Sequence, residues 1–345
     1  MPLYTSVLLR QNLTDLGLIP RTGGWTDSPD LIAAGTTPVG NPQSTYGSTA
    51  SYATDPTQQV VENAPNYFYL RGKNLGTTAT TAEARAFYAP QSLFLYPFQW
   101  LSNQMHTSQN ADVSVISSIA PNAIGVTTDP FVWVPPTTGE HYCVVGFLST
   151  AAVPFSSQQP PAAVTSLDDL AAWIGKNGGT GWHNVQWSSD SATFTKSTKF
   201  PASTTSALVQ LSLTCTGLPA NSQVSFSCGT PLPDGTVISM PKTTVPSTNQ
   251  IGFFVRAQIP AGWTSDISYS FYANGGTGLS TFNLAMSGSI VKQSNDQVFA
   301  EYAQPVHEVF PNHHLVDGRT GELTQLADFP MDYLVPVGSD VTMLT

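Results

Sequence analysis

Short runs of alternating apolar and polar residues, separated by turns rich in Gly and Pro, recur along the second half of this chain. From Val209 to Cys215 the alternation is strict, with an apolar residue at every second position. Successive side chains of a β-strand point to opposite faces, so this pattern predicts a strand with one buried face. Further strands are predicted at 192–195, 223–228, 236–240, 252–259, 268–272 and 281–291. Their lengths and spacing are typical of a sandwich of about seven or eight strands, here over residues 181–295.

A second group of strands is predicted in the first half of the chain. Residues 66–74 show a strong strand pattern, with Phe68 and Leu70 on one face and Arg71 on the other. The runs 82–88 and 113–119 alternate in the same way. Between residues 128 and 147, two more runs flank a turn that contains Pro135 and Pro136. This arrangement predicts a β-hairpin, which we expect to close a first sandwich over residues 61–152.

The remaining segments are predicted to connect or extend the two sandwiches. Residues 1–60 are rich in Gly, Pro, Ser and Thr and are expected to form an extended N-terminal arm. Residues 153–180 are expected to be a linker with one short helix, which Ser166 caps and which runs over about 167–176. Residues 296–345 are acidic, with Arg319 as their only Lys or Arg. This C-terminal extension is expected either to pack back on the sandwich or to pair with the sheet edge of a neighbouring subunit.

The charge of the chain limits its partners. Charged residues make up 10% of the 345 residues, against about 25% in an average globular protein. The formal net charge is -10, and no Lys or Arg stands between Arg85 and Lys176. A surface that follows phosphates needs clustered cations, so nucleic acid and anionic lipid are poor partner candidates. The turn-rich, weakly charged composition favours a secreted, surface-exposed or particle-associated protein.

The sequence contains no run of about 18 apolar residues, so no transmembrane segment is predicted. Its first ten residues lack the basic and apolar regions of a Sec signal peptide. We therefore expect the chain to be cytoplasmic before export and to leave the cell, if it does, by another route or after removal of a signal.

The sequence contains three cysteines, Cys143, Cys215 and Cys228, and no pair of them has the spacing of zinc ligands. A turn near residue 220 would place Cys215 opposite about residue 224, so a disulfide to Cys228 would need a shift in strand register. We expect three buried thiols that pack as small apolar groups. His141 lies two residues from Cys143 and could form a nucleophile pair with it, but packing is the favoured role for both.

Several short motifs follow one another in the first half of the chain. They are Ser28-Pro-Asp30, the segment 67–76, Trp100, and the segment 131–143 with the order Phe-Val-Trp-Val-Pro-Pro-Thr-Thr-Gly-Glu-His-Tyr-Cys. Together they resemble bacterial immunoglobulin-like modules of the CARDB type, with Ser28–Asp30 as a candidate first strand. The helix at 167–176, followed by Trp182, Asn184 and Val185, resembles the start of a second such module.

The resemblance implies an all-β fold with two tandem immunoglobulin-like β-sandwich domains. It also implies an extracellular or accessory adhesive role and no catalysis. Gly72 within the second strand and the long spacing between Asp30 and Tyr67 depart from the family pattern. Both departures leave the path of the N-terminal arm open.

Four alternating aromatic residues form the first candidate site: Phe94, Tyr96, Phe98 and Trp100. Exposed aromatic rings would offer a stacking surface for a glycan or for a protein partner. A sandwich core uses the same residues, and core packing is the alternative interpretation.

A second candidate site lies in the C-terminal extension, where His307, His313, His314 and Asp317 stand close together in the sequence. Imidazole and carboxylate groups suit zinc, nickel or copper, so a metal site is one hypothesis. The alternative is a polar surface turn around Pro311 and Asn312.

No nucleophile elbow, Gly-rich phosphate loop or His-Glu-x-x-His motif is present, so the sequence predicts neither an enzyme nor a cofactor. We expect a non-enzymatic binding or assembly component of a secreted or particle-associated bacterial system. Its expected contacts are with protein partners or with further copies of itself, and a glycan or a target-cell surface is a further candidate. One alternative function is a secreted toxin or effector that binds a target cell. The other is a metal-dependent hydrolase built on the C-terminal histidines.

Overall fold

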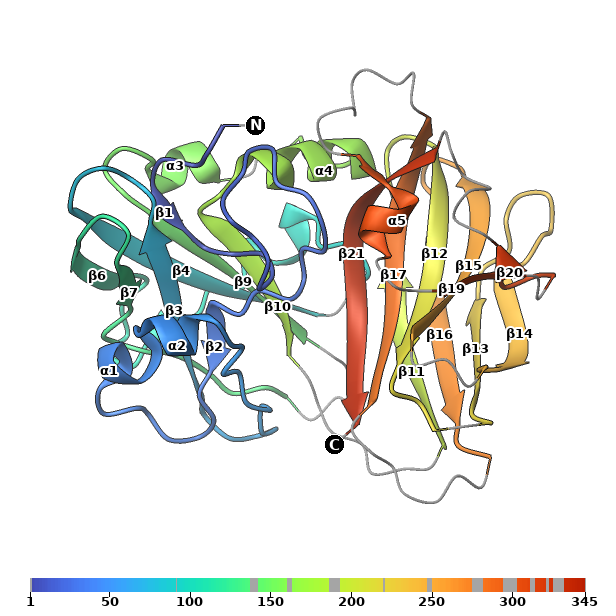
Figure 1. Cartoon of the computed structure of the whole chain (residues 1–345), viewed down its shortest axis with the longest axis horizontal. Coiled ribbons are helices and arrows are strands. Elements are labelled where there is room, and N and C mark those ends of the chain that lie inside the picture. The colour runs from blue at the N-terminus through green and yellow to red at the C-terminus, as the bar shows by residue number, and fades with distance from the viewer. Residues whose placement is uncertain are drawn as a thin grey trace. The chain divides into compact units, whose positions relative to one another are not determined.

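The computed structural model describes residues 2–90, 92–136, 142–159, 163–185, 193–219, 221–246, 250–274, 282–293, 303–310, 314–320, 323–324 and 332–344. The chain divides into two compact units (Figure 1). The first comprises residues 1–90, 95–164 and 172–185, and the second comprises 91–94, 165–171 and 186–345. The fold is all-β, as predicted, with short helices at a few positions.

The first unit contains two antiparallel sheets within its described residues. In one sheet, the central strand is β3 (Asn66–Asn74), and the others are β1 (Val7–Leu8), β2 (Leu31–Ala33), β5 (His106–Thr107), β7 (Ile124–Val126) and β8 (Phe131–Trp133). The other sheet has the order β10 (Thr180–Val185), β9 (Tyr142–Ser149), β4 (Thr80–Pro90) and β6 (Ser114–Ile119).

Aromatic side chains fill part of the core of the first unit. The Phe87 ring lies 5.5 Å from the Trp100 ring and 5.8 Å from the Phe147 ring, measured between centroids. Trp173 packs on Trp100 at 6.3 Å. Rings at such separations and tilts contribute favourable edge and offset contacts in addition to the burial of apolar surface.

The predicted hairpin between residues 128 and 147 is wrong, although both of its strands exist. β8 pairs with β3 and β5, whereas β9 pairs with β4 and β10, so the two strands belong to different sheets. Period-2 alternation identifies a strand but not its partner. Here the chain crosses from one sheet to the other after Pro135 and Pro136, and the Trp133 and Tyr142 rings meet at 5.0 Å.

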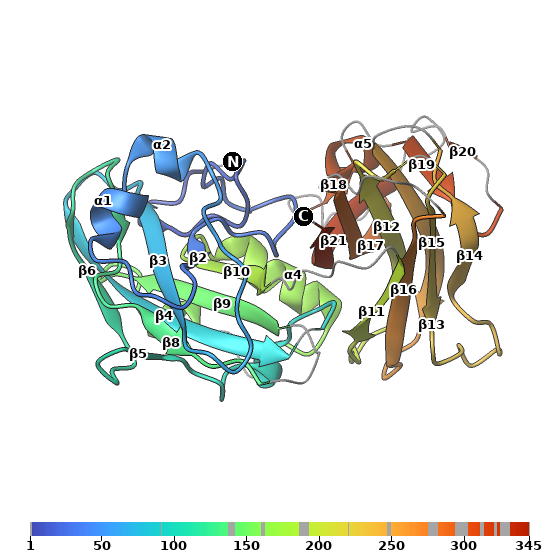
Figure 2. The same ribbon diagram turned by 90° about the horizontal axis from the view of Figure 1, so that it is seen from below.

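The N-terminal 60 residues, expected to form an extended arm, belong to the first unit. β1 and β2 both pair with β3. Between β2 and β3 lie two short helices, α1 (Pro42–Tyr46) and α2 (Thr49–Tyr52), which Figure 2 shows close to β3. The Tyr46 ring packs on Tyr69 of β3 at 5.9 Å, so this segment contributes to the core.

The second unit also contains two sheets within its described residues. One has the order β11 (Thr193–Phe200), β16 (Ser265–Tyr272), β13 (Gln223–Cys228) and β14 (Ser239–Thr244). The other has the order β18 (Gln304–Pro305), β21 (Asp332–Leu344), β17 (Phe282–Gln293), β12 (Ala207–Thr216), β15 (Gln250–Ile259), β19 (His314–Asp317) and β20 (Leu323–Thr324). The pair β15–β19 is parallel, and the other described pairs of this unit are antiparallel.

Strand β12 has the predicted inward face but a different outer face. Leu213 and Cys215 are buried, as the alternation predicts. Gln210, expected to point to solvent, is also buried, because its side chain accepts a hydrogen bond of 2.9 Å from Arg256 Nε and donates one to Ser212. Arg256 in turn pairs with Asp332, so a polar layer covers the outer side of this strand.

The described helices are short. Besides α1 and α2 they are the 3₁₀ turn η1 (Pro97–Gln99), α3 (Phe155–Gln158), α4 (Leu167–Lys176) and α5 (Val306–Val309). α4 has the predicted bounds. The Ser166 hydroxyl accepts a hydrogen bond of 3.1 Å from Asp169 N and donates one to the Asp169 carboxylate. The predicted cap therefore supplies a partner for a first-turn N–H group that the helix itself cannot satisfy.

Residues 296–345 belong to the second unit rather than to a separate segment. In Figure 1, β21 lies beside β17, and the two strands pair along the whole of β17. Leu334, Val335 and Val337 are fully buried. Of the two arrangements expected for this extension, the described residues therefore show the one in which it packs within its own chain.

Candidate binding surface

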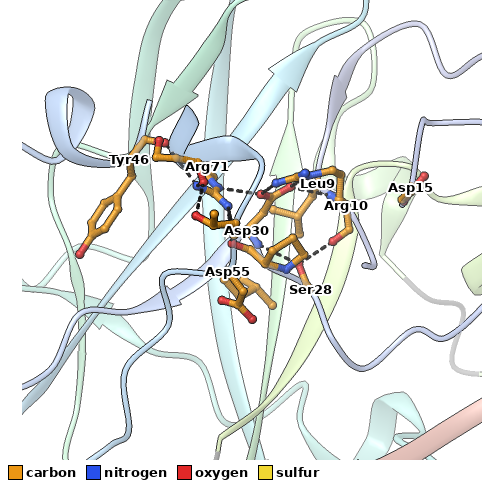
Figure 3. A network of polar contacts seen from close by, with 12 residues as sticks. Leu9, Arg10, Asp15, Ser28, Asp30, Tyr46, Asp55 and Arg71 are labelled. Carbon is orange, nitrogen blue, oxygen red and sulfur yellow. Dashed lines mark hydrogen bonds and ion pairs between the residues drawn. The ribbon is translucent and has the colours of Figure 1, made fainter. Parts of the chain in front are cut away.

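A buried carboxylate between two arginines fastens the N-terminal segment to the first unit (Figure 3). Asp30 accepts hydrogen bonds from Arg10 Nε at 2.9 Å, Arg10 Nη2 at 2.7 Å and Arg71 Nε at 2.8 Å. The backbone N–H of Arg10 adds a bond of 3.0 Å to the same carboxylate. All three side chains are buried. Charge-assisted bonds of this length are stronger than neutral ones, and they fix the relative positions of three chain segments.

Arg71 reaches this position from the middle of β3. Its backbone N–H donates to the Asp30 carbonyl, because β2 begins at the next residue and pairs with β3. The remaining guanidinium donors reach the carbonyls of Pro29, Ser51 and Thr54, at 2.9, 2.8 and 2.8 Å. These carbonyls offset the extra positive charge of the group and hold the end of α2 in place.

Tyr52 completes this anchor. The Arg10 guanidinium lies 3.4 Å from the centroid of its ring, which is a cation–π contact. Burial raises the pKa of the Tyr52 phenol, so the ring stays neutral at physiological pH. We call the residues Arg10, Asp30, Tyr52 and Arg71 the arginine anchor.

A second buried ion pair holds the loop that follows residue 10. Arg21 Nη2 lies 2.7 Å from Asp15 Oδ2, and both side chains are buried. The other donors of Arg21 reach the carbonyls of Leu9, Asn177 and Thr180. Asp15 also accepts a bond of 2.8 Å from the backbone N–H of Gly17. The loop is thus fixed to the start of β10.

Gly17 is needed for the path of this loop. Its φ of +80° is unfavourable for residues with a side chain, and a Cβ atom at this position would lie 2.5 Å from the Leu75 side chain. The Gly17 carbonyl accepts a bond of 2.7 Å from Tyr4 N, and Pro2 accepts one of 2.8 Å from Ile19 N. These bonds join the loop to the first residues of the described chain.

The loop and the N-terminal residues expose leucines. Leu3, Leu13, Leu16 and Leu18 keep 60%, 48%, 73% and 40% of their surface accessible. Leu3 and Leu18 are partners in an antiparallel bridge, so their side chains lie on the same face. In the described part of the chain the other large apolar residues with this exposure are scattered: Val61, Phe98, Val115, Val134, Leu208 and Val237. We call the four leucines the leucine surface.

The leucine surface and the buried ion pairs that hold its segment together define the candidate site. Exposed apolar side chains that gather on one short segment are typical of contact surfaces. Here the two buried ion pairs hold that segment in one conformation, so little conformational entropy remains to be lost when a partner binds. The four leucines therefore form a candidate contact surface for an apolar partner.

The predicted aromatic platform is not formed. Phe94, Tyr96 and Trp100 have no accessible surface, and Phe98 alone is exposed, at 67%. The Phe94 ring packs on Phe200 at 4.9 Å, and Trp100 lies in the core of the first unit. The alternation reflects burial, and Phe98, in the 3₁₀ turn at Pro97–Gln99, is exposed while its ring stacks on that of Tyr96 at 5.8 Å. The interpretation as core packing therefore holds for three of the four residues.

The predicted metal site is described only in part. His307 is exposed on α5. Asp317 accepts backbone hydrogen bonds from Arg319 N and Thr320 N, which is the geometry of a turn. His313 and the side chain of His314 lie outside the described residues. The residues that are described contain no group of three His, Cys, Asp or Glu arranged to hold a metal ion, and the histidine site stays a prediction.

The three cysteines are buried thiols, as predicted, but the assumed hairpin of Cys215 and Cys228 is wrong, because β12 and β13 belong to different sheets. All are free and buried, and Cys143 Sγ lies 2.9 Å from the Asn184 side-chain oxygen. The nucleophile pair of Cys143 with His141 falls partly outside the described residues, because His141 is not among them.

The residues of the anchor were not identified from the sequence, although one signal was available. Arg10 follows two leucines, and Arg71 stands within an aromatic-rich strand. In a chain with so few charges, a charged residue among strongly apolar neighbours indicates a buried pair, since Arg and Asp are rarely buried alone. The partner, Asp30, cannot be assigned by spacing alone.

Comparisons with known proteins leave the family open. No protein-family model and no curated protein matches this sequence. Among solved structures, a transglutaminase from red sea bream shares 10% identity over 68% of this chain and 28% of its own, with a TM-score of 0.21. An isomalto-dextranase of Arthrobacter globiformis T6 complexed with panose shares 12% identity over 70% of this chain and 38% of its own, with a TM-score of 0.20.

A collagen adhesin from S. aureus shares 10% identity over 82% of this chain and 91% of its own, with a TM-score of 0.16. The chain thus spans less than two fifths of the length of the first two structures. Likenesses at these TM-scores support no argument about function. A search of the described helices for one long and apolar enough to cross a membrane finds none.

Proposed function

We propose that this chain is a non-enzymatic binding or assembly component of a secreted or particle-associated bacterial system, and that it makes its contact through the leucine surface. The observation that carries the proposal is that four exposed leucines gather on one segment fixed by buried ion pairs. A relation to CARDB-type modules is part of the same proposal and rests on the sequence motifs alone.

The composition supports this choice of function. With 10% charged residues and a net charge of -10, the surface does not favour nucleic acid. Apolar side chains, by contrast, gain about 25 cal/mol per Å² when a partner covers them. Homo-oligomers mostly use one patch on both subunits, so a second copy of this chain is the first partner to test.

The test is the mass of the protein in solution, measured by light scattering over a range of concentrations. The wild type is expected to exceed the 36.7 kDa of one chain. The triple variant Leu3→Ser, Leu16→Ser and Leu18→Ser is expected to return to that mass, because it replaces three of the four exposed leucines and leaves the buried ion pairs intact.

A matched control makes three substitutions of the same kind elsewhere. Val134→Ser, Leu208→Ser and Val237→Ser change residues with 53%, 39% and 47% exposure outside the leucine surface. This control is expected to associate like the wild type. A wild type that stays monomeric at every concentration, or a triple variant that associates unchanged, contradicts the proposal.

A further inference from the structure

The second unit places a lysine on the inner face of its first described strand. Along β11, Phe194, Thr198 and Phe200 face the interior, whereas Thr193, Thr195, Ser197 and Lys199 are exposed. Lys196 follows the same alternation, so its side chain leaves the strand on the inner face and is half-buried. An inward-pointing amine is costly in an apolar interior unless it has a partner.

A carboxylate lies on the last strand of the same unit. Asp340 of β21 has no accessible surface, and Thr342, two residues further on the same face, is also buried. β11 and β21 belong to different sheets of this unit, so the lysine and the carboxylate come from opposite sheets.

Tyr269 of β16 brings the two groups to one place. It is the backbone partner of Lys196 in the β11–β16 register, so the two side chains are direct neighbours on the inner face. Its hydroxyl lies 2.9 Å from Thr342 Oγ1, two residues from Asp340 on the same face of β21. The Tyr269 ring has no accessible surface. The flexible four-carbon stem of Lys196 therefore leaves its strand beside Tyr269, on the side of the interior where Tyr269 meets β21, and Asp340 influences the charge of its amine.

We propose that Lys196 and Asp340 are joined by an intramolecular amide bond between Lys196 Nζ and Asp340 Cγ. The ammonium first gives a proton to the carboxylate, which leaves a neutral amine beside a neutral acid. The amine nitrogen then attacks Cγ, a C–N bond forms, and one C–O bond breaks. The hydroxyl leaves with a proton from the nitrogen as water, so no oxidant, reductant or other reactant is needed.

The surroundings favour each part of this step. Burial lowers the pKa of Lys196, and the Asp340 carboxylate only partly opposes that effect. The neutral, reactive form of the amine is therefore easier to reach than in an exposed lysine. Burial also raises the pKa of the Tyr269 phenol, so its hydroxyl stays protonated and can donate a hydrogen bond to the carboxyl oxygen when negative charge develops there. Two reactants held side by side in one folded chain react as if at very high concentration.

The bond would join the first and last long strands of the second unit. A cross-link between residues so far apart in the sequence restricts the unfolded chain and raises stability. The competing interpretation is that Lys196 is an inward charge which protects the edge strand β11 from pairing with other chains, with Asp340 as its counter-ion.

Mass spectrometry of the full-length protein after trypsin digestion distinguishes the amide bond from the unlinked inward charge. The amide blocks cleavage at Lys196 and predicts a branched product in which residues 177–199 are joined to residues 320–345, lighter than the sum of both by one water. The variant Lys196→Arg keeps the positive charge but cannot form the amide, so it is expected to yield only linear peptides. Tyr269→Phe is expected to lower the fraction of branched product.

The wild-type digest decides the question even if a variant fails to fold. A wild-type protein that yields the linear peptides 177–196 and 320–345, with no branched product, overturns the proposal and leaves Lys196 as an inward charge. The same digest says nothing about the leucine surface, so this inference and the proposed function fail independently.

Discussion

Asp30 shows at the scale of one residue how a weakly charged chain uses its charges. A buried ion pair contributes little net stability compared with apolar packing, because both charges must leave water. Removing one partner is a different matter, since the charge left behind stays buried and unpaired. Asp30 accepts bonds from two arginines, so its loss would leave two cations in the interior.

We therefore predict that Asp30→Asn lowers the free energy of unfolding by about 3–5 kcal/mol. The measurement is urea denaturation followed by tryptophan fluorescence. The matched control is Glu83→Gln, which removes the partner of Arg85 in an ion pair of 3.3 Å whose acidic side chain is 55% exposed. Exposed pairs contribute about 0–1 kcal/mol, so the control is expected to change little. Equal effects of the two variants would contradict the role given to the anchor.

The buried thiols of the second unit predict a loss of stability at alkaline pH. Burial raises the pKa of Cys228 from its ordinary 9.0 to about 12 and also raises the pKa of Cys215. In the unfolded chain both thiols ionise near pH 9, whereas in the folded protein they stay protonated. Unfolding thus releases protons above pH 9, so stability is unaffected below that pH and falls above it, by about 1.4 kcal/mol per thiol and pH unit.

The check is urea denaturation of the wild type and of Cys228→Ala at pH 8, 9 and 10. Cys228→Ala is expected to be less stable throughout but to lose less stability between pH 9 and 10, because one ionising thiol is gone. The same slope in both proteins would show that this thiol does not titrate as its burial requires.

At the scale of elements, β21 makes the C-terminal residues an integral part of the second unit. It lies between β18 and β17 in its sheet and places Leu334, Val335 and Val337 in the interior. Loss of the strand would expose the apolar residues of β17 and leave that strand with unpaired backbone groups at a new sheet edge.

We predict that a chain ending at residue 331 does not fold its second unit. The expected result is the loss of the unfolding transition of that unit in calorimetry, together with aggregation, whereas removal of Thr345 alone has no effect. A truncated chain that stays soluble and keeps both transitions would show that β21 is dispensable.

The same elements show how far the sequence predicts the fold. β3 and α4 were predicted with their observed bounds, because each carries a complete local pattern: period-2 alternation in one and a cap with an apolar stripe in the other. The partners of β8 and β9 were not predicted correctly, since the choice of partner depends on the whole sheet. Neither was the folding of residues 1–60, whose few apolar residues are buried only because β1 and β2 find β3.

The leucine surface is harder to predict from sequence patterns than the strands and helices are. A leucine in a turn-rich segment looks the same whether it is covered or exposed, and only the tertiary contacts of its neighbours decide which. Leu8 and Leu9 are buried, whereas Leu3 and Leu16, a few residues away, are exposed. The aromatic run at residues 94–100 shows the opposite case, because core packing, one of its two predicted roles, buries three of its four rings.

At the scale of the whole molecule, we propose that copies of this chain meet at the leucine surface, whose segment is held by the arginine anchor and the Asp15–Arg21 pair. Sheet edges are the main competing contact, because the second unit has the edge strands β11 and β14 among its described residues. The two kinds of contact would protect different backbone amides from solvent.

Amide hydrogen exchange, measured by mass spectrometry at a concentration where the protein is associated and at one where it is monomeric, locates the contact directly. We predict that association slows exchange in residues 2–19 and leaves β11 and β14 unchanged. Slower exchange in β11 or β14 with no change in residues 2–19 would contradict the claim and place the contact at a sheet edge.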